Sequence, residues 1–245
     1  MLEAKELYSY YGKSPILQNV SFTLKKGELL AVMGRNGVGK TTLMRSIMGL
    51  TDRLEGGLRF DGTEIAHMRT PARAQLGIGY IPQGREVIPR FTVRENIVMG
   101  TYARTDGKRD IPDYIFDLFP ILSEFIDRNG GDLSGGQQQQ RAIARALAMD
   151  PKMLILDEPT EGIQPNIVSQ IHDIIVQLNR EMGLTIVLVE QNVPFARKVS
   201  DRFMVIDKGR IVISGKGAEL TDEVADKHLT FWAWPRGAEV PCISP

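Results

Sequence analysis

Short apolar runs alternate along the chain with stretches whose apolar residues recur at helical spacing. The runs predict buried strands at Leu29–Met33, Met153–Asp157, Leu184–Glu190 and Arg202–Asp207. Helices are predicted after Lys40 and over residues 165–182, where one apolar stripe contains Ile167, Ile171, Ile174, Ile175, Leu178 and Met182. Such a stripe is typical of core packing rather than of a ligand site. Strands that alternate with helices predict an α/β fold with a parallel sheet.

Two regions depart from this alternation. Short strands at Asn19–Leu24 and Leu58–Phe60 predict an antiparallel fringe. The middle of the chain has helical periodicity, over Thr92–Tyr102 after a threonine cap, Ile111–Phe119 and Pro120–Arg128. We therefore predict one lobed domain over residues 1–227, with a helical subdomain inserted at about 84–150, and a C-terminal tail over residues 228–245.

A glycine-rich turn lies between the first of these apolar strands and the helix after it. Its residues are Gly34, Arg35, Asn36, Gly37, Val38, Gly39, Lys40, Thr41 and Thr42. Glycines let backbone N–H groups approach phosphate oxygens, Lys40 adds a mobile positive charge, and the Thr41 hydroxyl suits Mg²⁺. A strand before the turn and a helix after it favour a nucleotide phosphate site over a simple glycine-rich turn.

Paired carboxylates end the strand predicted at Met153–Asp157. Asp157 is suited to hold the Mg²⁺ shell through water, because Mg²⁺ dehydrates reluctantly and accepts few protein ligands. Glu158 is suited to polarise the attacking water and is the predicted general base. An acidic turn after a strand is common by itself, and the phosphate loop upstream is what favours the catalytic interpretation.

A second candidate phosphate contact is the run Ser134, Gly135, Gly136 and Gln137. Ser134 can cap the helix that follows, whose free N–H groups and dipole suit a γ-phosphate. An ordinary capped helix is the alternative. Two glycines are poor helix formers, however, and their presence at a helix start needs another reason.

With these motifs in this order and spacing, the chain resembles the ATP-binding subunit of ABC transporters, over almost everything up to Gly215. The resemblance implies a P-loop NTPase fold of the ABC ATPase type, with a mainly parallel central sheet, an antiparallel β fringe and an inserted helical subdomain. It also implies ATPase activity with ATP and Mg²⁺. ATP would lie between two subunits, held by the phosphate loop of one and by Ser134–Gln137 of the other.

The resemblance also assigns roles to single residues. Tyr11 matches the aromatic residue that stacks on adenine, with Tyr8 and Tyr10 as near competitors. Gln83 matches the glutamine that reaches Mg²⁺ and the attacking water. The expected metal contacts are therefore Thr41, Gln83 and Asp157, and the expected catalytic residues are Lys40, Gln83, Glu158 and Gln191.

Two positions differ from most of the family. Gln191 replaces a histidine, and its amide can donate to the γ-phosphate but cannot carry charge. Many relatives have an aspartate near Gln164 that contacts the opposite subunit, so this difference bears on communication between the two sites. The residues at these two positions, together with the stretches Pro82–Glu86 and Gln137–Gln140, make the chain similar to one branch of the family, the branched-chain amino-acid type importers. Thr160–Pro165 is similar to the subunit of urea and short-chain amide importers.

This branch resemblance implies partners. They are membrane permease subunits, a second ATP-binding subunit that is either a copy or a related chain, and a periplasmic or extracellular solute-binding protein. A groove between the helical lobe and Gln83 would receive a short permease helix, with Ile88 and Phe91 in the socket. Core packing is the alternative for the apolar residues of this lobe, among them Ile88, Phe91, Phe116, Phe119 and Phe125.

Composition bears on the partners and the cellular location that we expect. Thirty basic and thirty acidic residues give no bulk field for nucleic acid, which we do not expect as a partner. The single cysteine, Cys242, excludes an internal disulfide and is consistent with the cytoplasm. No apolar stretch approaches the roughly twenty residues of a membrane helix, and no signal peptide opens the sequence. We expect a peripheral subunit on the cytoplasmic face of the inner or plasma membrane, attached through the permease.

The remaining features carry less information. His67, His172 and His228 have no metal-ligand spacing. In the tail, Trp232 and Trp234 predict either docking on a surface or disorder beyond Pro235.

Two other functions have to be weighed. A soluble ABC-type ATPase acting on DNA or ribosomes usually has two ATP-binding halves or long coiled-coil inserts, and this chain has one copy of each motif, no heptad run and no basic stripe. A non-hydrolytic, ATP-gated binding module would lack the general base. Glu158 argues against the module, and Gln191 is the one feature that favours it.

Overall fold

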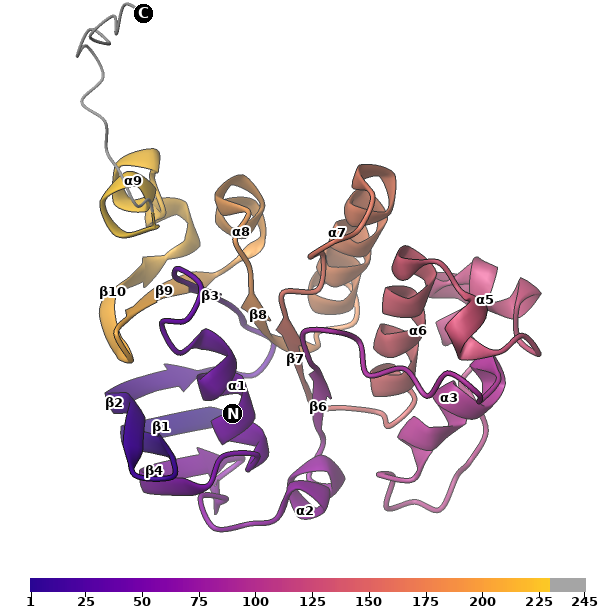
Figure 1. Ribbon diagram of the computed structural model, residues 1–245, viewed down its shortest axis with the longest axis horizontal. Coiled ribbons are helices and arrows are strands. Elements are labelled where there is room, and N and C mark those ends of the chain that lie inside the picture. The colour runs from indigo at the N-terminus through magenta and orange to yellow at the C-terminus, as the bar shows by residue number, and fades with distance from the viewer. Residues whose placement is uncertain (230–245) are drawn as a thin grey trace, which may run out of the picture.

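The computed structural model describes residues 1–229 of the chain, and its centre is a six-stranded sheet. The strand order is β10-β9-β3-β8-β7-β6 (Figure 1). Every neighbouring pair from β9 to β6 is parallel, and only β10 pairs antiparallel, with β9. The strands are β3 (Leu29–Met33), β6 (Ile78–Ile81), β7 (Met153–Asp157), β8 (Thr185–Val189), β9 (Arg202–Asp207) and β10 (Arg210–Lys216).

A second, antiparallel sheet has the order β2-β1-β4-β5. Its strands are β1 (Leu2–Tyr11), β2 (Ser14–Leu24), β4 (Arg53–Phe60) and β5 (Thr63–Glu64). Helix α1 (Lys40–Met48) lies between the two sheets, and its Leu43, Met44 and Ile47 are buried among residues of both (Figure 1). The helix that begins at the phosphate loop is therefore fixed on both sides.

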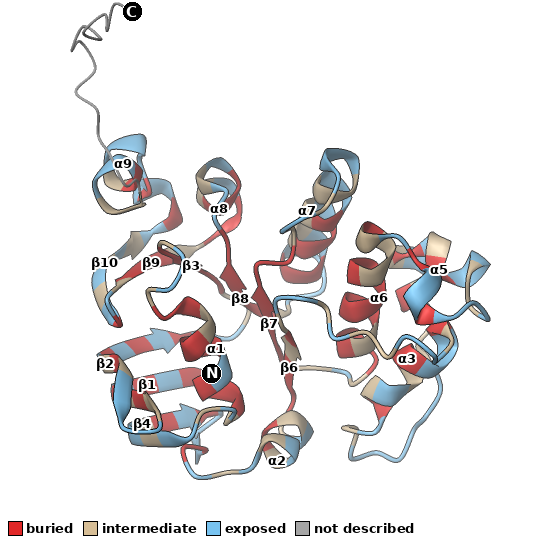
Figure 2. Cartoon of the chain, in the orientation of Figure 1, coloured by how far each residue is buried: buried red, intermediate tan, exposed pale blue. Residues whose placement is uncertain are grey.

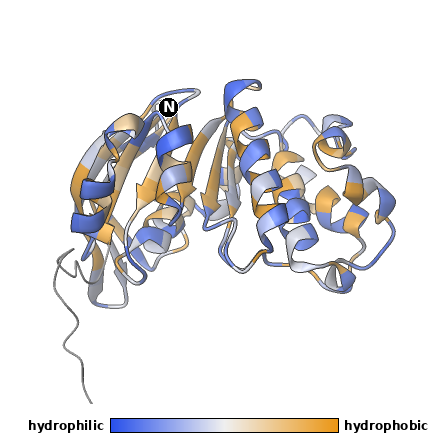
Figure 3. Ribbon diagram, turned by 90° about the horizontal axis from the view of Figure 1, so that it is seen from above, coloured by the Kyte–Doolittle hydropathy of each residue, from blue (hydrophilic) through white to orange (hydrophobic). Residues whose placement is uncertain are grey.

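Alternate residues of the central strands enter two different cores. In β7, Met153 and Ile155 face the core that contains α1, whereas Leu154 and Leu156 face a core built with α6 (Gly135–Leu147) and α7 (Pro165–Arg180). Burial on both faces explains why these strands are uniformly apolar in sequence. Figure 2 shows β7 and β8 buried along their length, and Figure 3 shows apolar strands beneath helices with polar outer faces.

The remaining helices extend the core on either side. α8 (Val193–Val199) and α9 (Asp222–Leu229) lie beyond β8 and β10, and α2 (Thr70–Gln75) precedes β6. The helical lobe beside β6 contains α3 (Val93–Thr101), α4 (Tyr114–Leu118), α5 (Pro120–Glu124) and α6. Short 3₁₀ turns occur at Gly130–Asp132 and Gly217–Glu219. Among residues 1–229, none of the helices has the length and apolarity needed to cross a bilayer.

Several sequence predictions are confirmed. β3, β7 and β9 have the predicted bounds, the sheet is mainly parallel, and the fringe is antiparallel. Thr92 caps α3 through a capping box, in which its side chain accepts from the Glu95 N–H at 3.2 Å. The predicted stripe on α7 is buried at Ile171, Ile174, Ile175 and Leu178.

Other predictions need correction. Met182 is 49% exposed because α7 ends at Arg180, before the last position of the stripe. β8 ends at Val189, which leaves Glu190 outside the strand. The antiparallel strands extend beyond the predicted Asn19–Leu24 and Leu58–Phe60, and α4 and α5 are shorter than Ile111–Phe119 and Pro120–Arg128. Strands β1, β6 and β10 were not predicted. Trp232, Trp234 and Cys242 lie outside the described residues.

Candidate functional site

The phosphate loop runs from the end of β3 into α1. Gly34 has φ 148°, and a Cβ there would lie 2.5 Å from the Ile206 carbonyl oxygen, so only glycine fits this close approach. Gly39 precedes α1 with φ 114°. Val38 packs against the core, and its carbonyl accepts from the Gly209 N–H at 2.9 Å. The turn between β9 and β10 thus anchors the loop through Gly209.

Lys40 is buried in this loop, with 4% of its surface exposed. Its ammonium donates to the carbonyl oxygens of Gly34 and Arg35, each at 2.9 Å, and lies 3.2 Å from Glu158 Oε1. An ammonium has three donors, and here each has an oxygen partner. The charge is therefore held at a fixed place beside the loop, paired with the predicted general base.

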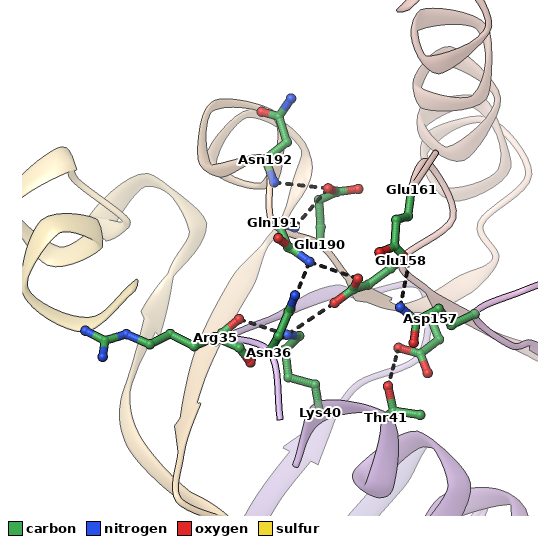
Figure 4. A network of polar contacts seen from close by, with 12 residues as sticks. Arg35, Asn36, Lys40, Thr41, Asp157, Glu158, Glu161, Glu190, Gln191 and Asn192 are labelled. Carbon is green, nitrogen blue, oxygen red and sulfur yellow. Dashed lines mark hydrogen bonds and ion pairs between the residues drawn. The ribbon is translucent and has the colours of Figure 1, made fainter. Parts of the chain in front are cut away.

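Glu158 follows β7 in a left-handed conformation, with φ 50°. This conformation costs a non-glycine residue on the order of 1–3 kcal/mol, and such strain is concentrated at functional sites. The Glu158 side chain turns back toward the loop, where Gln191 Nε2 donates to its Oε2 at 2.9 Å. The same Nε2 contacts Asn36 Oδ1 at 3.1 Å (Figure 4). Gln191 thus joins the carboxylate to the phosphate loop.

Asp157 lies at the end of β7 and is fully buried. Thr41 Oγ1 contacts its Oδ1 at 3.3 Å, and the Tyr80 hydroxyl contacts its Oδ2 at 3.5 Å. Burial raises the pKa of Asp157 to about 6, partly opposed by the hydrogen bond from Thr41. A buried carboxylate with so few partners is suited to share a cation with the Thr41 hydroxyl.

A hollow of about 260 Å³ opens above these groups. Its lining consists of Asn36, Gly37, Gly39, Lys40, Thr41, Thr42, Gln83 and Glu158. The structure thus brings together the predicted phosphate, base and glutamine residues. The oxygen donors of Thr41, Asp157 and Gln83 are the hard ligands that Mg²⁺ prefers, so the residues present fit that ion.

Gln83 is also tied to the segment after Glu158. Its Nε2 donates to Glu161 Oε2 at 2.6 Å, and Arg85 Nη2 donates to the Glu161 carbonyl at 3.1 Å. Arg85 is itself left-handed, with φ 68°. The turn after β6 and the turn after β7 are therefore connected next to the phosphate hollow.

The Ser134–Gln137 run begins α6 in the helical lobe. Ser134 caps the helix, its N–H donates to Gln137 Oε1 at 2.9 Å, and its Oγ accepts from the Gln137 N–H at 3.4 Å. A Cβ on Gly136 would lie 2.6 Å from Ile167 of α7, and one on Gly135 would lie 2.9 Å from Arg85. Close packing against Ile167 thus explains Gly136, whereas Gly135 faces only the flexible end of Arg85, and neither glycine lines the phosphate hollow.

Tyr11 ends β1 near α1, with the Arg45 guanidinium 5.8 Å from its ring. Of its competitors, Tyr10 is engaged elsewhere, since its hydroxyl donates to Glu55 at 3.0 Å and Arg53 stacks on its ring at 3.9 Å. Tyr11 therefore lies beside the helix that follows the phosphate loop.

Four residues near the site were not singled out from the sequence: Tyr80, Thr160, Glu161 and Glu190. Glu190 directly precedes Gln191, and Thr160 and Glu161 closely follow Glu158. That proximity was the available signal. The side-chain partners of all four come from other segments of the chain, which sequence order does not show, although Glu190 also accepts from the N–H groups of its own turn.

Known proteins are similar to this chain in sequence. A family model described as ABC transporter matches residues 17–161. The high-affinity branched-chain amino acid transport ATP-binding protein BraG of Pseudomonas aeruginosa is 40% identical over 232 residues, which is 94% of this chain and 99% of BraG. The probable branched-chain amino acid transport ATP-binding protein LivF of Archaeoglobus fulgidus is 39% identical over 225 residues, covering 91% of this chain and 94% of LivF.

Solved structures of ATP-binding cassettes have a similar fold. An ATP-binding cassette captured as a dimer in a post-hydrolysis state with ADP and Pi superposes with a TM-score of 0.79 at 27% identity, covering 88% of this chain and 98% of that one. The expected fold and ATPase class are confirmed. By its sequence and its fold, this chain belongs to the ABC transporter family of ATP-binding proteins.

Proposed function

We propose that this chain is the ATP-hydrolysing subunit of an ABC importer, and that it dimerises on ATP to drive a membrane permease. The observation that carries the proposal is the network in which Lys40, Glu158 and Gln191 meet at the phosphate hollow (Figure 4). It places a cation, a carboxylate and an amide donor around one point, which is what transfer of a γ-phosphoryl group to water requires.

Each residue has a definite task in this reaction. The loop N–H groups and Lys40 hold the β- and γ-phosphates, and the incoming phosphate oxygens draw the ammonium away from Glu158. Glu158, released from that ion pair, accepts the proton of the attacking water. Gln191 donates to the γ-phosphate from the position where its Nε2 now contacts Glu158. Tyr11 is assigned to the adenine.

Mg²⁺ would be held by Thr41, Asp157 and Gln83. When bound, it neutralises developing charge on the β- and γ-phosphate oxygens. Gln83 would use its Oε1 to hold the ion, while its Nε2 donates to Glu161 Oε2 at 2.6 Å and so orients the amide. Arg85, which donates to the Glu161 carbonyl at 3.1 Å, holds the turn that carries Glu161.

A second subunit supplies the other face of the nucleotide. Ser134–Gln137 begins a capped helix on the lobe, away from the phosphate hollow of the same chain. Its N–H groups suit the γ-phosphate bound by a partner. One chain thus carries two half-sites, and two chains, copies or paralogues, make two whole sites.

The importer partners come from the branch resemblance. The names of BraG and LivF state branched-chain amino acid transport, which supports that solute class here. Urea and short-chain amides stay a prediction from Thr160–Pro165. We place the subunit on the cytoplasmic face of the membrane, attached through permease subunits, with a solute-binding protein in the full complex.

The test is ATP hydrolysis by purified wild-type and Glu158→Gln protein. We expect kcat to fall at least about 100-fold in the variant, because the amide cannot accept the water proton, while ATP binding persists. Glu181→Gln, an exposed change beyond α7, is the matched control and keeps wild-type kcat. Unchanged turnover in Glu158→Gln would overturn the assignment of the base. ATP binding without turnover in wild-type protein would instead favour the ATP-gated module.

A further inference from the structure

A second hollow, of about 310 Å³, adjoins the phosphate hollow on the side of α8. Its lining consists of Asn36, Glu158, Thr160, Glu161, Glu190, Gln191 and Asn192. Glu190 is the carboxylate in this group to which no role has been given. It follows β8 and is 4% exposed, so its charge is almost wholly removed from water.

The Glu190 carboxylate holds the backbone of the turn that carries Gln191. Its Oε1 accepts from the N–H of Gln191 at 2.9 Å and from the N–H of Asn192 at 3.0 Å. Its Oε2 accepts from Thr160 Oγ1 at 3.3 Å. One side chain therefore joins the turn after β8 to the segment that follows Glu158. Figure 4 shows the Glu190 carboxylate beside Gln191 and Asn192.

The fold does not need this carboxylate to begin α8. Asn192 already caps that helix, since its side chain accepts from the Phe195 N–H at 2.9 Å. Burying Glu190 is also costly, and desolvation raises its pKa. On its other side, the Glu190 carboxylate faces His172 of α7, whose Nε2 lies 4.0 Å from Glu190 Oε2. The His172 ring stacks on the Phe195 ring with 3.4 Å between the ring centroids. A buried charge that capping does not require points to a functional reason.

That reason is the position of Gln191. Its amide reaches both Glu158 and Asn36, at 2.9 and 3.1 Å, from a short turn with no regular structure of its own. A catalytic group displaced by about 1 Å can lose on the order of 100-fold in rate. Hydrogen bonds to two consecutive backbone N–H groups fix such a turn well.

We propose that Glu190 is a positioning residue for ATP hydrolysis, which sets the Gln191 amide relative to Glu158 by anchoring the backbone of residues 191 and 192. The inference rests on the proposed function, because it deepens the role of Gln191 in the same site. Glu190 does not line the phosphate hollow, so we expect it to act on turnover rather than on ATP binding.

The experiment compares Glu190→Leu and Glu190→Gln in purified full-length protein. Leu has similar volume and no acceptor, and we expect kcat to fall at least about 10-fold with KM for ATP changed less than about 3-fold. Gln keeps one acceptor oxygen for the two N–H groups, and it should retain kcat within about 3-fold. An equal loss in both variants would contradict anchoring through an acceptor.

A double-mutant cycle separates positioning from general damage. In a Gln191→Ala background, adding Glu190→Leu should cost less than about 2-fold in kcat, because the side chain that Glu190 positions is already gone. The same factor in both backgrounds would overturn the proposal. If Glu190→Leu does not fold, as judged by circular dichroism, the cycle is run with Glu190→Ala.

Glu64→Leu is the matched control. Glu64 Oε1 also accepts from two backbone N–H groups, those of Leu58 and Ala66, each at 3.1 Å, but in the antiparallel sheet away from the site. It should lower the melting temperature and leave kcat unchanged. Glu158→Gln is assayed in parallel. Wild-type turnover in Glu158→Gln would overturn both the proposed function and this inference, whereas turnover that needs Glu158 and ignores Glu190→Leu would overturn this inference alone.

Discussion

At the scale of single residues, the site is built from groups whose placement costs stability. Asp157 is fully buried, and burial raises its pKa from 3.8 to about 6. The folded state therefore holds this proton more tightly than the unfolded state does. Folding stability falls as the pH rises from about 4 to about 6, and the full penalty of about 3 kcal/mol is present above pH 6.

We therefore expect Asp157→Asn to stabilise the nucleotide-free protein. Above pH 7 the free energy of unfolding should rise by about 1–3 kcal/mol, because the amide has no charge to desolvate, and the gain should shrink as the pH falls toward 4. ATP hydrolysis should fall at least about 100-fold, since the carboxylate that we propose for the Mg²⁺ site is lost. Urea titrations at pH 7.5 and 4.5 check the first point, with the exposed Asp117→Asn as control. A less stable variant at pH 7.5 would contradict the account.

At the scale of elements, the helix after the phosphate loop is held at its far end by Arg73. This side chain is 2% exposed, and its Nη1 donates to the carbonyls of Ser46 and Ile47, each at 2.7 Å. Nε and Nη2 donate to Met68 and Ala66, each at 2.9 Å. Burial lowers the pKa of Arg73 to about 10, which still leaves it charged. A cation here satisfies the last carbonyls of α1 and complements its dipole.

Arg73→Met should accordingly destabilise the protein by about 2–4 kcal/mol, because four carbonyls lose a hydrogen bond from a buried cation. Arg73→Lys should recover little of that loss, since one ammonium cannot reproduce the planar fork of donors. Guanidinium unfolding measures both variants. Arg69→Met, an exposed arginine before α2, is the control and should change stability by less than about 0.5 kcal/mol. If Arg73→Met matched the control, the cap would have no energetic role.

The elements also show how far sequence alone reaches. β3, β7 and β9 were predictable because burial on both faces makes them uniformly apolar, and the loop before α1 was predictable because its chemistry is local. β1 was missed because Glu6 is left-handed, with φ 49°, and a register shift there breaks the alternation of buried and exposed residues.

At the site, Lys40 and Glu158 were predicted from local sequence patterns. Glu190 was not, because its importance depends on contacts with Thr160 and with the backbone of its own turn, and these exist only in the folded chain.

At the scale of the whole molecule, the proposed permease contact concerns the exposed part of the helical lobe. Phe91 is 37% exposed, and its carbonyl is fixed by Asn96 Nδ2 at 3.0 Å, which also bonds the Ile88 carbonyl at 3.1 Å. The backbone of this loop is thus rigid at two points. Phe119, by contrast, is 1% exposed and belongs to the core. Core packing therefore holds for Phe119, whereas Phe91, with Ile88, stays a candidate for the permease socket.

Phe91→Asp should uncouple transport from hydrolysis. In the reconstituted importer we expect solute uptake to fall at least about 10-fold, because a charge would be buried at the permease contact. The ATPase activity of the purified subunit should stay within about 2-fold of wild type. Phe91→Leu keeps the apolar contact and should transport nearly normally. Full uptake by the Phe91→Asp complex would exclude Phe91 from the socket.

The phosphate hollow and the start of α6 lie on different lobes, so the central claim is that a working site needs both from different chains. Subunit complementation tests it most directly. Lys40→Ala and Ser134→Glu proteins should each be inactive, and a 1:1 mixture should recover about a quarter of wild-type ATPase activity, because mixed dimers contain one intact composite site. An inactive mixture of folded variants, or wild-type turnover by Ser134→Glu alone, would contradict the account.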